Sequence, residues 1–284
     1  MSSRSPTTRS GLAHPARLAH RRVTEPGAHP DRWVLFLHGF LGAGRNWASI
    51  GRGLVRARPD WGVVLVDLRL HGDSSGFAPP HTVAASAADV NDLALALGGR
   101  ENVLAGHSFG GKVALAAARS PGQGLRQVWV LDSTPDPGRT QAGADRLLAL
   151  IGRLPDRFDD RRDAVAAIRG AGFDPVIAEW VATNLGRTVD GYRWRFDVTA
   201  LELLLADFYR EDLWPVVERP PPGVELVFVR ASRATILTDP AADRISRLEA
   251  DGEPVRLLDL EGGHWLNMTN PEGLLALLVR GLPV

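Results

Sequence analysis

The sequence predicts an α/β fold in which a mostly parallel central sheet is flanked by helices. Short apolar runs, typical of strands that are buried on both faces, alternate with longer helical segments. The alternation stops between residues 135 and 215, where helices are expected, and then resumes. We therefore predict a core of residues 26–134 and 216–284, with a helical cap, residues 135–215, inserted before the penultimate strand. The predicted strands are residues 33–37, 62–67, 103–105, 127–131, 224–230 and 255–260.

Composition excludes several classes of protein. The 284 residues, 44% of them hydrophobic, are enough for one large α/β domain. With 33 basic and 33 acidic residues the net charge is zero, so neither nucleic acid nor an acidic membrane surface is expected as the main partner. The absence of cysteine excludes disulfides, thiolate zinc sites and a cysteine nucleophile. No apolar run reaches the roughly 18 residues that a membrane span needs, and we expect a cytoplasmic protein.

Residues 1–25 are expected to form an arm outside the core. The segment is rich in Ser, Arg, His and Ala but lacks the apolar stretch of a secretory signal. We expect a disordered or partly extended arm, with an organellar presequence as the alternative. Residues 18–23 are a candidate edge strand.

Two turns follow the first two predicted strands. Residues 38–42, His-Gly-Phe-Leu-Gly, stand at a strand's C-terminal end, where α/β sheets build their sites. His38 is expected to order this turn rather than to act as a base. The charged segment 67–74 is expected to brace its loop rather than to take part in catalysis. The helices that come next are predicted at residues 45–57 and 83–97, the second ended by Gly98-Gly99.

The Gly-x-Ser-x-Gly motif at residues 106–110 is the strongest signal in the chain. It lies between a buried strand and an Ala-rich helix, residues 113–119. Such a turn holds its serine in a strained conformation above the sheet, and its two glycines let strand and helix approach closely. Ser108 is therefore the candidate nucleophile. The backbone N–H of Phe109, at the start of the helix, could face a developing oxyanion.

Two further candidates follow strands elsewhere in the chain. Asp132 comes directly after residues 127–131, ahead of a proline turn that it could otherwise cap. His264 lies in a Gly-Gly turn after the last strand. The remaining histidines show no metal-binding spacing such as His-Glu-x-x-His, so no metal is indicated. The last two helices are predicted at residues 240–250 and 272–279.

Four helical segments make up the predicted cap. Aromatic residues in such helices usually form the insertion's own core, although they could also line an apolar pocket. The aromatic residues are Trp180, Trp194, Phe196, Phe208 and Trp214, and the segments are residues 146–153, 161–169, 175–185 and 201–209.

Four motifs together resemble those of α/β-hydrolases. From about residue 33 to 283 the chain is similar to the small esterase branch that includes bacterial thioesterase/esterase proteins and mitochondrial abhydrolase-domain-11-like proteins. The motifs are specific for the fold and much less specific for the substrate. They are His38-Gly-Phe40, Asp67-x-Arg-x-His-Gly-x-Ser74, Gly106-His-Ser-Phe-Gly110 and Gly263-His-Trp265.

This resemblance implies a serine hydrolase that needs no cofactor. Ser108 would be the nucleophile, His264 the general base, and an acid would orient His264. The backbone N–H groups of Phe40 and Phe109 would form the oxyanion hole. The substrate would be a small-molecule carboxylic ester, or a thioester, cleaved through an acyl-enzyme.

Two carboxylates compete for the role of the acid. Many α/β-hydrolases carry it after the strand that corresponds to residues 224–230, where the first carboxylate of this chain is Asp239, about nine residues further on. The branch that the chain resembles can place the acid one strand earlier, at Asp132. We predict Asp132, with Asp239 as the alternative and Asp207 as a more remote candidate.

Other activities fit the same residues. A cofactor-free haloperoxidase or perhydrolase, an acyltransferase or a C–C bond hydrolase would keep the same triad. Haloalkane dehalogenases and epoxide hydrolases use an aspartate nucleophile, and Ser108 argues against both. Outside enzymes, the alternative is a small-molecule receptor with little turnover.

Overall fold

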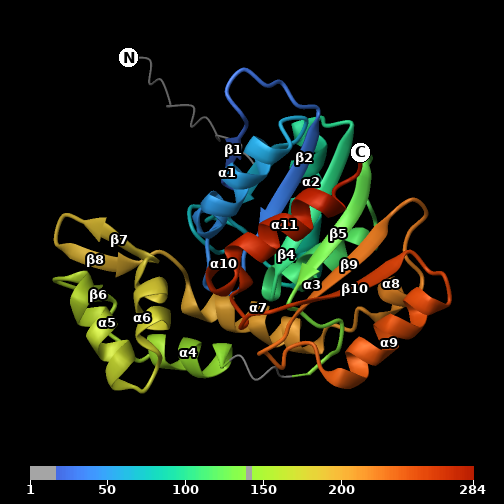
Figure 1. The fold of residues 1–284 in the computed structure, drawn as a ribbon. Coiled ribbons are helices and arrows are strands. Elements are labelled where there is room, and N and C mark those ends of the chain that lie inside the picture. The colour runs from blue at the N-terminus through green and yellow to red at the C-terminus, as the bar shows by residue number, and fades with distance from the viewer. Residues whose placement is uncertain (1–16, 139–142) are drawn as a thin grey trace, which may run out of the picture.

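The computed structural model describes residues 17–138 and 143–284, and in these a seven-stranded sheet forms the centre of the molecule (Figure 1). Its strands are β1 (His20–Val23), β2 (Arg32–Leu37), β3 (Gly62–Val66), β4 (Glu101–His107), β5 (Leu125–Leu131), β9 (Glu225–Ala231) and β10 (Val255–Leu260). Their order is β1-β3-β2-β4-β5-β9-β10. Only β1 is antiparallel to its neighbour, and every other pairing in this sheet is parallel. The predicted mostly parallel sheet is confirmed.

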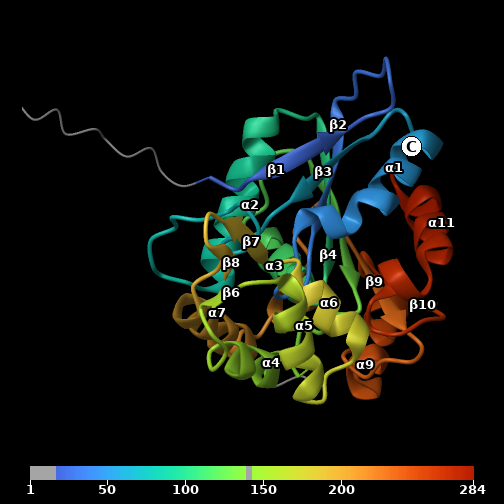
Figure 2. The same cartoon turned by 90° about the vertical axis from the view of Figure 1, so that its left-hand side faces the viewer.

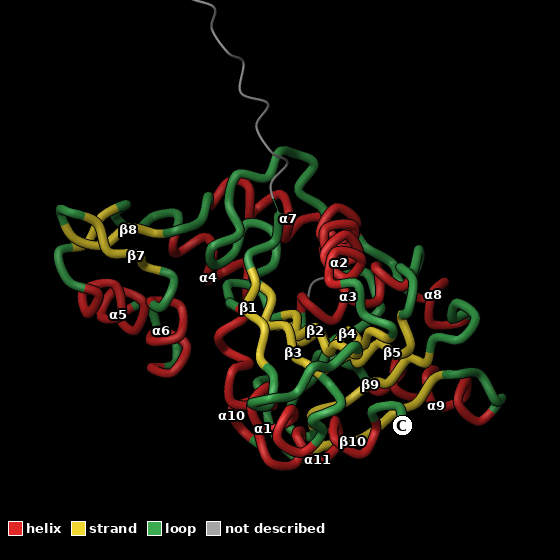
Figure 3. Tube along the Cα trace, turned by 90° about the horizontal axis from the view of Figure 1, so that it is seen from above, coloured by secondary structure: helices red, strands yellow, loops and turns green. Residues whose placement is uncertain are grey.

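Helices cover both faces of this sheet (Figures 2 and 3). The longer ones are α1 (Ala48–Ala57), α2 (Val83–Leu97), α3 (Phe109–Ala118), α9 (Asp239–Ala250) and α11 (Pro271–Gly281). Leu35 and Leu37 of β2 share one apolar cluster with α2 and α3, whereas Val34 and Phe36 share the other with α1 and α11. All four side chains are fully buried. This period of two explains why a strand covered on both faces is a continuous apolar run.

The ends of α2 illustrate how local sequence sets an element. The Thr82 side chain accepts the Ala85 N–H at 3.0 Å, which satisfies one of the free donors at the helix N-terminus. At the other end Gly98 has a φ of 68°, the left-handed conformation that ends helices. The helix therefore has the bounds that the sequence predicted.

The four helices predicted in the insertion are present, but the expectation that it is helical throughout is wrong. Its helices are α4 (Ala144–Ile151), α5 (Arg161–Gly170), α6 (Pro175–Ala182) and α7 (Val198–Arg210). Its described part also contains a three-stranded antiparallel sheet, with β6 (Arg157–Phe158), β7 (Leu185–Thr188) and β8 (Gly191–Trp194) in the order β6-β8-β7. A Cβ on Gly191 would lie 2.3 Å from the Phe158 carbonyl oxygen, so this glycine permits the strands to approach. Strands of two to four residues are too short to show a clear alternation in sequence.

The insertion lies beside the C-terminal ends of the parallel strands, where the short helix α10 (Leu266–Thr269) also lies (Figure 1). In Figure 1 the insertion occupies the lower left, with α7 running beneath the sheet, whereas the C-terminus of the chain is at the top. Another short helix, α8 (Trp214–Glu218), leads from the insertion back into the core.

The candidate edge strand near the N-terminus is confirmed as β1. His20 pairs with Val66 and Val23 with Val63, antiparallel to β3. For the rest of the predicted arm, residues 1–16 lie outside the described residues.

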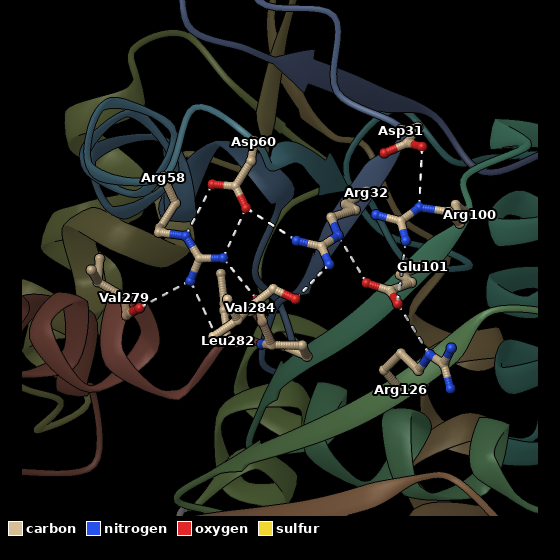
Figure 4. Close-up of polar contacts among 11 residues, drawn as sticks. Asp31, Arg32, Arg58, Asp60, Arg100, Glu101, Arg126, Val279, Leu282 and Val284 are labelled. Atoms are coloured by element: carbon tan, nitrogen blue, oxygen red, sulfur yellow. Dashed lines mark hydrogen bonds and ion pairs between the residues drawn. The ribbon is translucent and has the colours of Figure 1, made fainter.

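Two arginines bind the C-terminal segment at the end of the sheet where the strands β2 and β4 begin (Figure 4). Arg58 donates a hydrogen bond to the Pro283 carbonyl and Arg32 to the Val284 carbonyl, each at 2.7 Å. Arg32 also forms an ion pair with Glu101 at 2.8 Å, and the two side chains are only 11% and 10% exposed. Exposed ion pairs contribute about 0–1 kcal/mol, whereas a shielded pair attracts more strongly but also costs more to desolvate. The candidate site lies at the opposite end of the sheet, where the parallel strands end.

Among the described helices, none is long and apolar enough to cross a membrane. The longest, α2, has 15 residues, fewer than the roughly 20 that a bilayer requires. The cytoplasmic location stays a prediction.

Candidate active site

Ser108 lies in a sharp turn between β4 and α3. Its φ of 52° and ψ of −114° are strained for a residue with a side chain, a conformation that costs about 1–3 kcal/mol. Two hydrogen bonds hold it there. The Ser108 N–H donates to the Leu131 carbonyl at 3.1 Å, and the Ser133 hydroxyl donates to the Ser108 carbonyl at 2.6 Å. The end of β5 thus fixes the turn that β4 enters.

The two glycines of the motif are required by the close approach of strand and helix. A Cβ on Gly106 would lie 2.1 Å from the Gly110 carbonyl oxygen. A Cβ on Gly110 would lie 2.4 Å from the Leu37 carbonyl oxygen at the end of β2. Both distances are far below van der Waals contact with rigid backbone, so the small residues that the sequence indicated are needed for steric reasons.

The structure brings Ser108, His264 and Asp132 together from the ends of three strands. His264 Nε2 lies 3.1 Å from Ser108 Oγ, and His264 Nδ1 lies 2.6 Å from Asp132 Oδ2. Asp132 is fully buried, and its other oxygen accepts the Ala231 N–H at 3.1 Å. An ionised carboxylate only accepts hydrogen bonds, so Nδ1 carries the proton and Nε2 offers its lone pair to the serine hydroxyl.

The two other candidate acids lie elsewhere. Asp239 is the first residue of α9, pairs with Arg230 and has a side chain that is 81% exposed. Asp207 of α7 accepts the Val83 N–H at 2.8 Å and thereby caps α2 from the insertion. Within the described ranges, neither carboxylate contacts His264.

The turn at residues 38–42 lies against Ser108. A Cβ on Gly39 would lie 3.6 Å from the Ser108 Cβ, and the Phe40 ring packs edge-on against the Phe109 ring at 5.9 Å between centroids. The backbone N–H groups of Phe40 and Phe109 find no hydrogen-bond acceptor among residues 17–138 and 143–284. For Phe109 the reason is its position as first residue of α3, where the helix offers no carbonyl.

His38 orders this turn, as its position in the sequence suggested. Its Nε2 accepts the Leu68 N–H at 2.9 Å, so the proton is on Nδ1, which donates to the Gly39 carbonyl at 2.8 Å. Burial lowers the pKa of His38 to about 4, and the ring is neutral at physiological pH.

The charged segment after β3 also braces its loop. Asp67 accepts the Gly44 N–H at 2.7 Å and the Asp73 N–H at 2.9 Å. Arg69 forms an ion pair with Asp89 of α2 at 2.7 Å. In the described residues, no group of three or more His, Cys, Asp or Glu side chains could hold a metal ion.

An apolar pocket of about 70 Å³ opens beside Ser108. Trp180 of α6 contacts Trp265, the neighbour of His264, at 6.3 Å between ring centroids, so the insertion meets the core here. Of the five aromatic residues considered in the insertion, Trp180 lines this pocket, whereas Trp194 stacks on Phe196 at 5.4 Å within the insertion. The lining includes Leu41, His107, Ile177, Trp180, His264 and Trp265.

Sequence reasoning missed Lys112. This side chain is fully buried in α3, and its Nζ donates to the carbonyls of Asp136, Phe208 and Glu211 at 2.7–2.9 Å. Lys112 therefore joins the helix after Ser108 to both ends of the insertion. A signal was present in the sequence, because Lys112 is the only lysine among 32 arginines. A compact ammonium group fits three converging carbonyls better than a planar guanidinium.

Comparison with known proteins agrees with the motifs. The model of the alpha/beta hydrolase family matches residues 34–277. The sn-1-specific diacylglycerol lipase ABHD11 of Xenopus tropicalis is 28% identical over 251 residues, which cover 85% of this chain and 75% of that protein. Lipase LipV of Mycobacterium tuberculosis is 29% identical over 254 residues, 86% of this chain and 91% of that protein. A solved marine microorganism esterase has a TM-score of 0.78 at 22% identity, covering 94% of this chain and 100% of that one. The predicted resemblance to abhydrolase-domain-11-like proteins is confirmed.

Proposed function

The chain belongs to the alpha/beta hydrolase family and is a hydrolase of that superfamily, and we propose that it cleaves carboxylic esters through an acyl-enzyme on Ser108. One observation carries the proposal: His264 contacts Ser108 Oγ through Nε2 and the buried Asp132 through Nδ1. This is the arrangement in which an imidazole can take a proton from a hydroxyl and return it to a leaving group.

The chemistry follows from these contacts. Ser108 Oγ attacks the ester carbonyl carbon while His264 Nε2 takes its proton. The tetrahedral intermediate collapses as the proton passes to the leaving alkoxide, which departs as an alcohol. Water then repeats the sequence on the acyl-enzyme and releases the acid. Asp132 stays ionised throughout and stabilises the imidazolium that forms at His264.

Two backbone donors would stabilise the negative charge on the carbonyl oxygen. The Phe40 and Phe109 N–H groups flank Ser108 and have no acceptor among the described residues, which supports this role. Donors held in place before the reaction need no reorganisation as charge develops, and one such donor typically contributes about 2.7–4 kcal/mol.

The pocket and the relatives support an ester as the substrate. In the proposed cap, residues 135–215, the side chains of Leu147, Phe173, Ile177 and Trp180 give the pocket an apolar wall that suits an acyl chain. Two of the relatives are named lipases, and lipases cleave carboxylic esters. A thioester would use the same machinery, and relative rates on paired oxygen and sulfur esters would separate the two.

The proposal is tested by hydrolysis of p-nitrophenyl acetate, butyrate and decanoate. We expect multiple turnovers by the parent and a loss on the order of a thousandfold or more in kcat for Ser108→Ala. Unchanged turnover in Ser108→Ala would overturn the proposal. A parent that is acylated once and then stops would indicate a receptor in place of an enzyme.

A further inference from the structure

His107 occupies a position beside the proposed machinery that the reaction described above does not use. It is the last residue of β4, directly before Ser108, and its side chain is buried. Its ring lies 4.6 Å from the His264 ring between centroids. Its Nε2 lies 2.7 Å from the backbone carbonyl oxygen of His264, which also accepts the Leu266 N–H at 3.2 Å.

The direction of this hydrogen bond is fixed by its partner. A carbonyl oxygen only accepts, so His107 Nε2 carries a proton and donates it. Burial, together with the nearby His264, lowers the pKa of His107 to about 3, so the ring is neutral during catalysis at neutral pH. A neutral ring does not repel the imidazolium that the proposed reaction forms at His264.

The other side of the same ring faces the turn at residues 38–42. A Cβ on Gly39 would lie 3.0 Å from His107 Nδ1, so no space remains between ring and turn. His264 itself follows two glycines, and Gly262 has a φ of 154°, a backbone that few other residues adopt. The position of the loop that carries His264 therefore depends on contacts with residues outside this loop.

We infer that His107 is a positioning residue: by donating from Nε2 to the His264 carbonyl it holds the His264 imidazole within reach of Ser108 Oγ. This inference rests on the proposed function. It assigns His107 no contact with the reacting atoms, and its effect passes through the loop that carries His264. Misplacement of a reacting group by about 1 Å can reduce a rate about a hundredfold.

A matched pair of variants tests the donor. In His107→Gln the amide nitrogen stands at the same number of bonds from the backbone as Nε2 and can still donate to the His264 carbonyl. In His107→Asn the amide nitrogen corresponds to Nδ1 and cannot reach it. His107→Phe keeps the ring and removes the donor. Each variant is assayed with p-nitrophenyl butyrate beside the parent and Ser108→Ala, and thermal unfolding verifies that it is folded at the assay temperature.

We expect His107→Asn and His107→Phe to lower kcat about 10- to 100-fold with KM within about threefold, and His107→Gln to keep kcat within about threefold of the parent. A purely structural His107 would lower the unfolding temperature and leave kcat of the folded variants unchanged. That result, or an equal loss in Gln and Asn, overturns the inference. If His107→Phe does not fold, the Gln and Asn pair decides alone. If the parent is active and the His107 variants have the same kcat, only this inference is overturned. If the parent is inactive, the proposed function is overturned and the inference with it.

Discussion

Asp132 Oδ2 lies 2.6 Å from His264 Nδ1, although 132 residues separate the two along the chain. Asp132 follows β5, yet its backbone N–H donates to Val229 and its Oδ1 accepts from Ala231, both in β9. Its φ of 43° is strained for a residue with a side chain. The backbone at the end of β5 thus turns toward β9 and places the Asp132 carboxylate beside His264. In many α/β-hydrolases the carboxylate at this place comes from the loop after the strand that corresponds to β9.

The acid can be identified by a pair of isosteric substitutions. Asp132→Asn is expected to lower kcat on the order of 10⁴-fold while the protein stays folded, because an amide no longer fixes the tautomer that accepts the serine proton. Asp239→Asn is expected to leave kcat close to that of the parent, since this side chain is exposed and pairs with Arg230. The measurement is kcat on p-nitrophenyl butyrate. The reverse result would transfer the role to Asp239.

Trp180 is expected to limit acyl-chain length. It closes the pocket against Trp265, and its other side borders a surface groove with Val176 and Met268, which are 53% and 50% exposed. Trp180→Ala should join pocket and groove, and raise the ratio of kcat/KM for decanoate over acetate about tenfold. Trp194→Ala is the matched control, because this tryptophan stacks on Phe196 away from the pocket. An equal ratio of kcat/KM for decanoate over acetate in Trp180→Ala and Trp194→Ala would contradict the prediction.

Three buried histidines make stability depend on pH. Burial lowers the pKa of His38 to about 4 and those of His71 and His107 to about 3, from the ordinary value of 6.5. Below pH 6.5 the unfolded chain therefore binds more protons than the folded protein, and the free energy of unfolding falls as pH falls. Each histidine contributes about 1.4 kcal/mol per pH unit, or about 4 kcal/mol per unit for all three, until the folded pKa is reached.

Urea unfolding between about pH 7.5 and 5.5 measures this slope. His71→Asn is the informative variant, because its amide can still donate to the Arg69 carbonyl that His71 Nδ1 binds at 2.8 Å, but it does not titrate. Over this interval its free energy of unfolding should change by about 1.4 kcal/mol less than that of the parent, because one histidine fewer takes up a proton in the unfolded chain. A free energy of unfolding that is flat over this interval would show that the histidines are not buried as neutral rings.

Lys112 is expected to stabilise the junction of core and insertion. Lys112→Met removes the donor from three backbone carbonyls, one of them buried and two partly buried, and should lower the free energy of unfolding by roughly 2–4 kcal/mol. Lys112→Arg should also destabilise, because the planar guanidinium cannot direct its donors to three converging oxygens. Chemical unfolding of the two variants and the parent gives the values. A neutral Lys112→Arg would indicate that charge alone matters at this position.

The sequence was sufficient for the sheet and for the gathering of Ser108, Asp132 and His264 because each follows a predicted strand. Parallel strands end at one edge, so residues directly after them meet there. That Asp132 is the acid stays a prediction, although the structure brings it, and not Asp239, to His264. The hydrogen bond from His107 had no local signal, because it depends on how the last loop folds over β4.

The insertion was harder to predict for a related reason. The meeting of Trp180 with Trp265 depends on how the insertion folds over the core, and no periodicity encodes that approach. The small sheet β6-β8-β7 consists of strands of two to four residues, and pairing between segments stabilises it more than the preference of any one segment.

The isolation of Lys112 among arginines gives the protein a built-in reporter. A reagent that acylates ε-amines finds one target in this sequence, and this side chain is buried between α3 and the insertion. The rate of labelling under native conditions therefore measures how often the contact between α3 and the insertion opens and exposes Lys112. Mass spectrometry could follow breathing of the insertion in the unmodified protein, with no engineered probe, and a ligand that locks the insertion onto the core would slow the reaction.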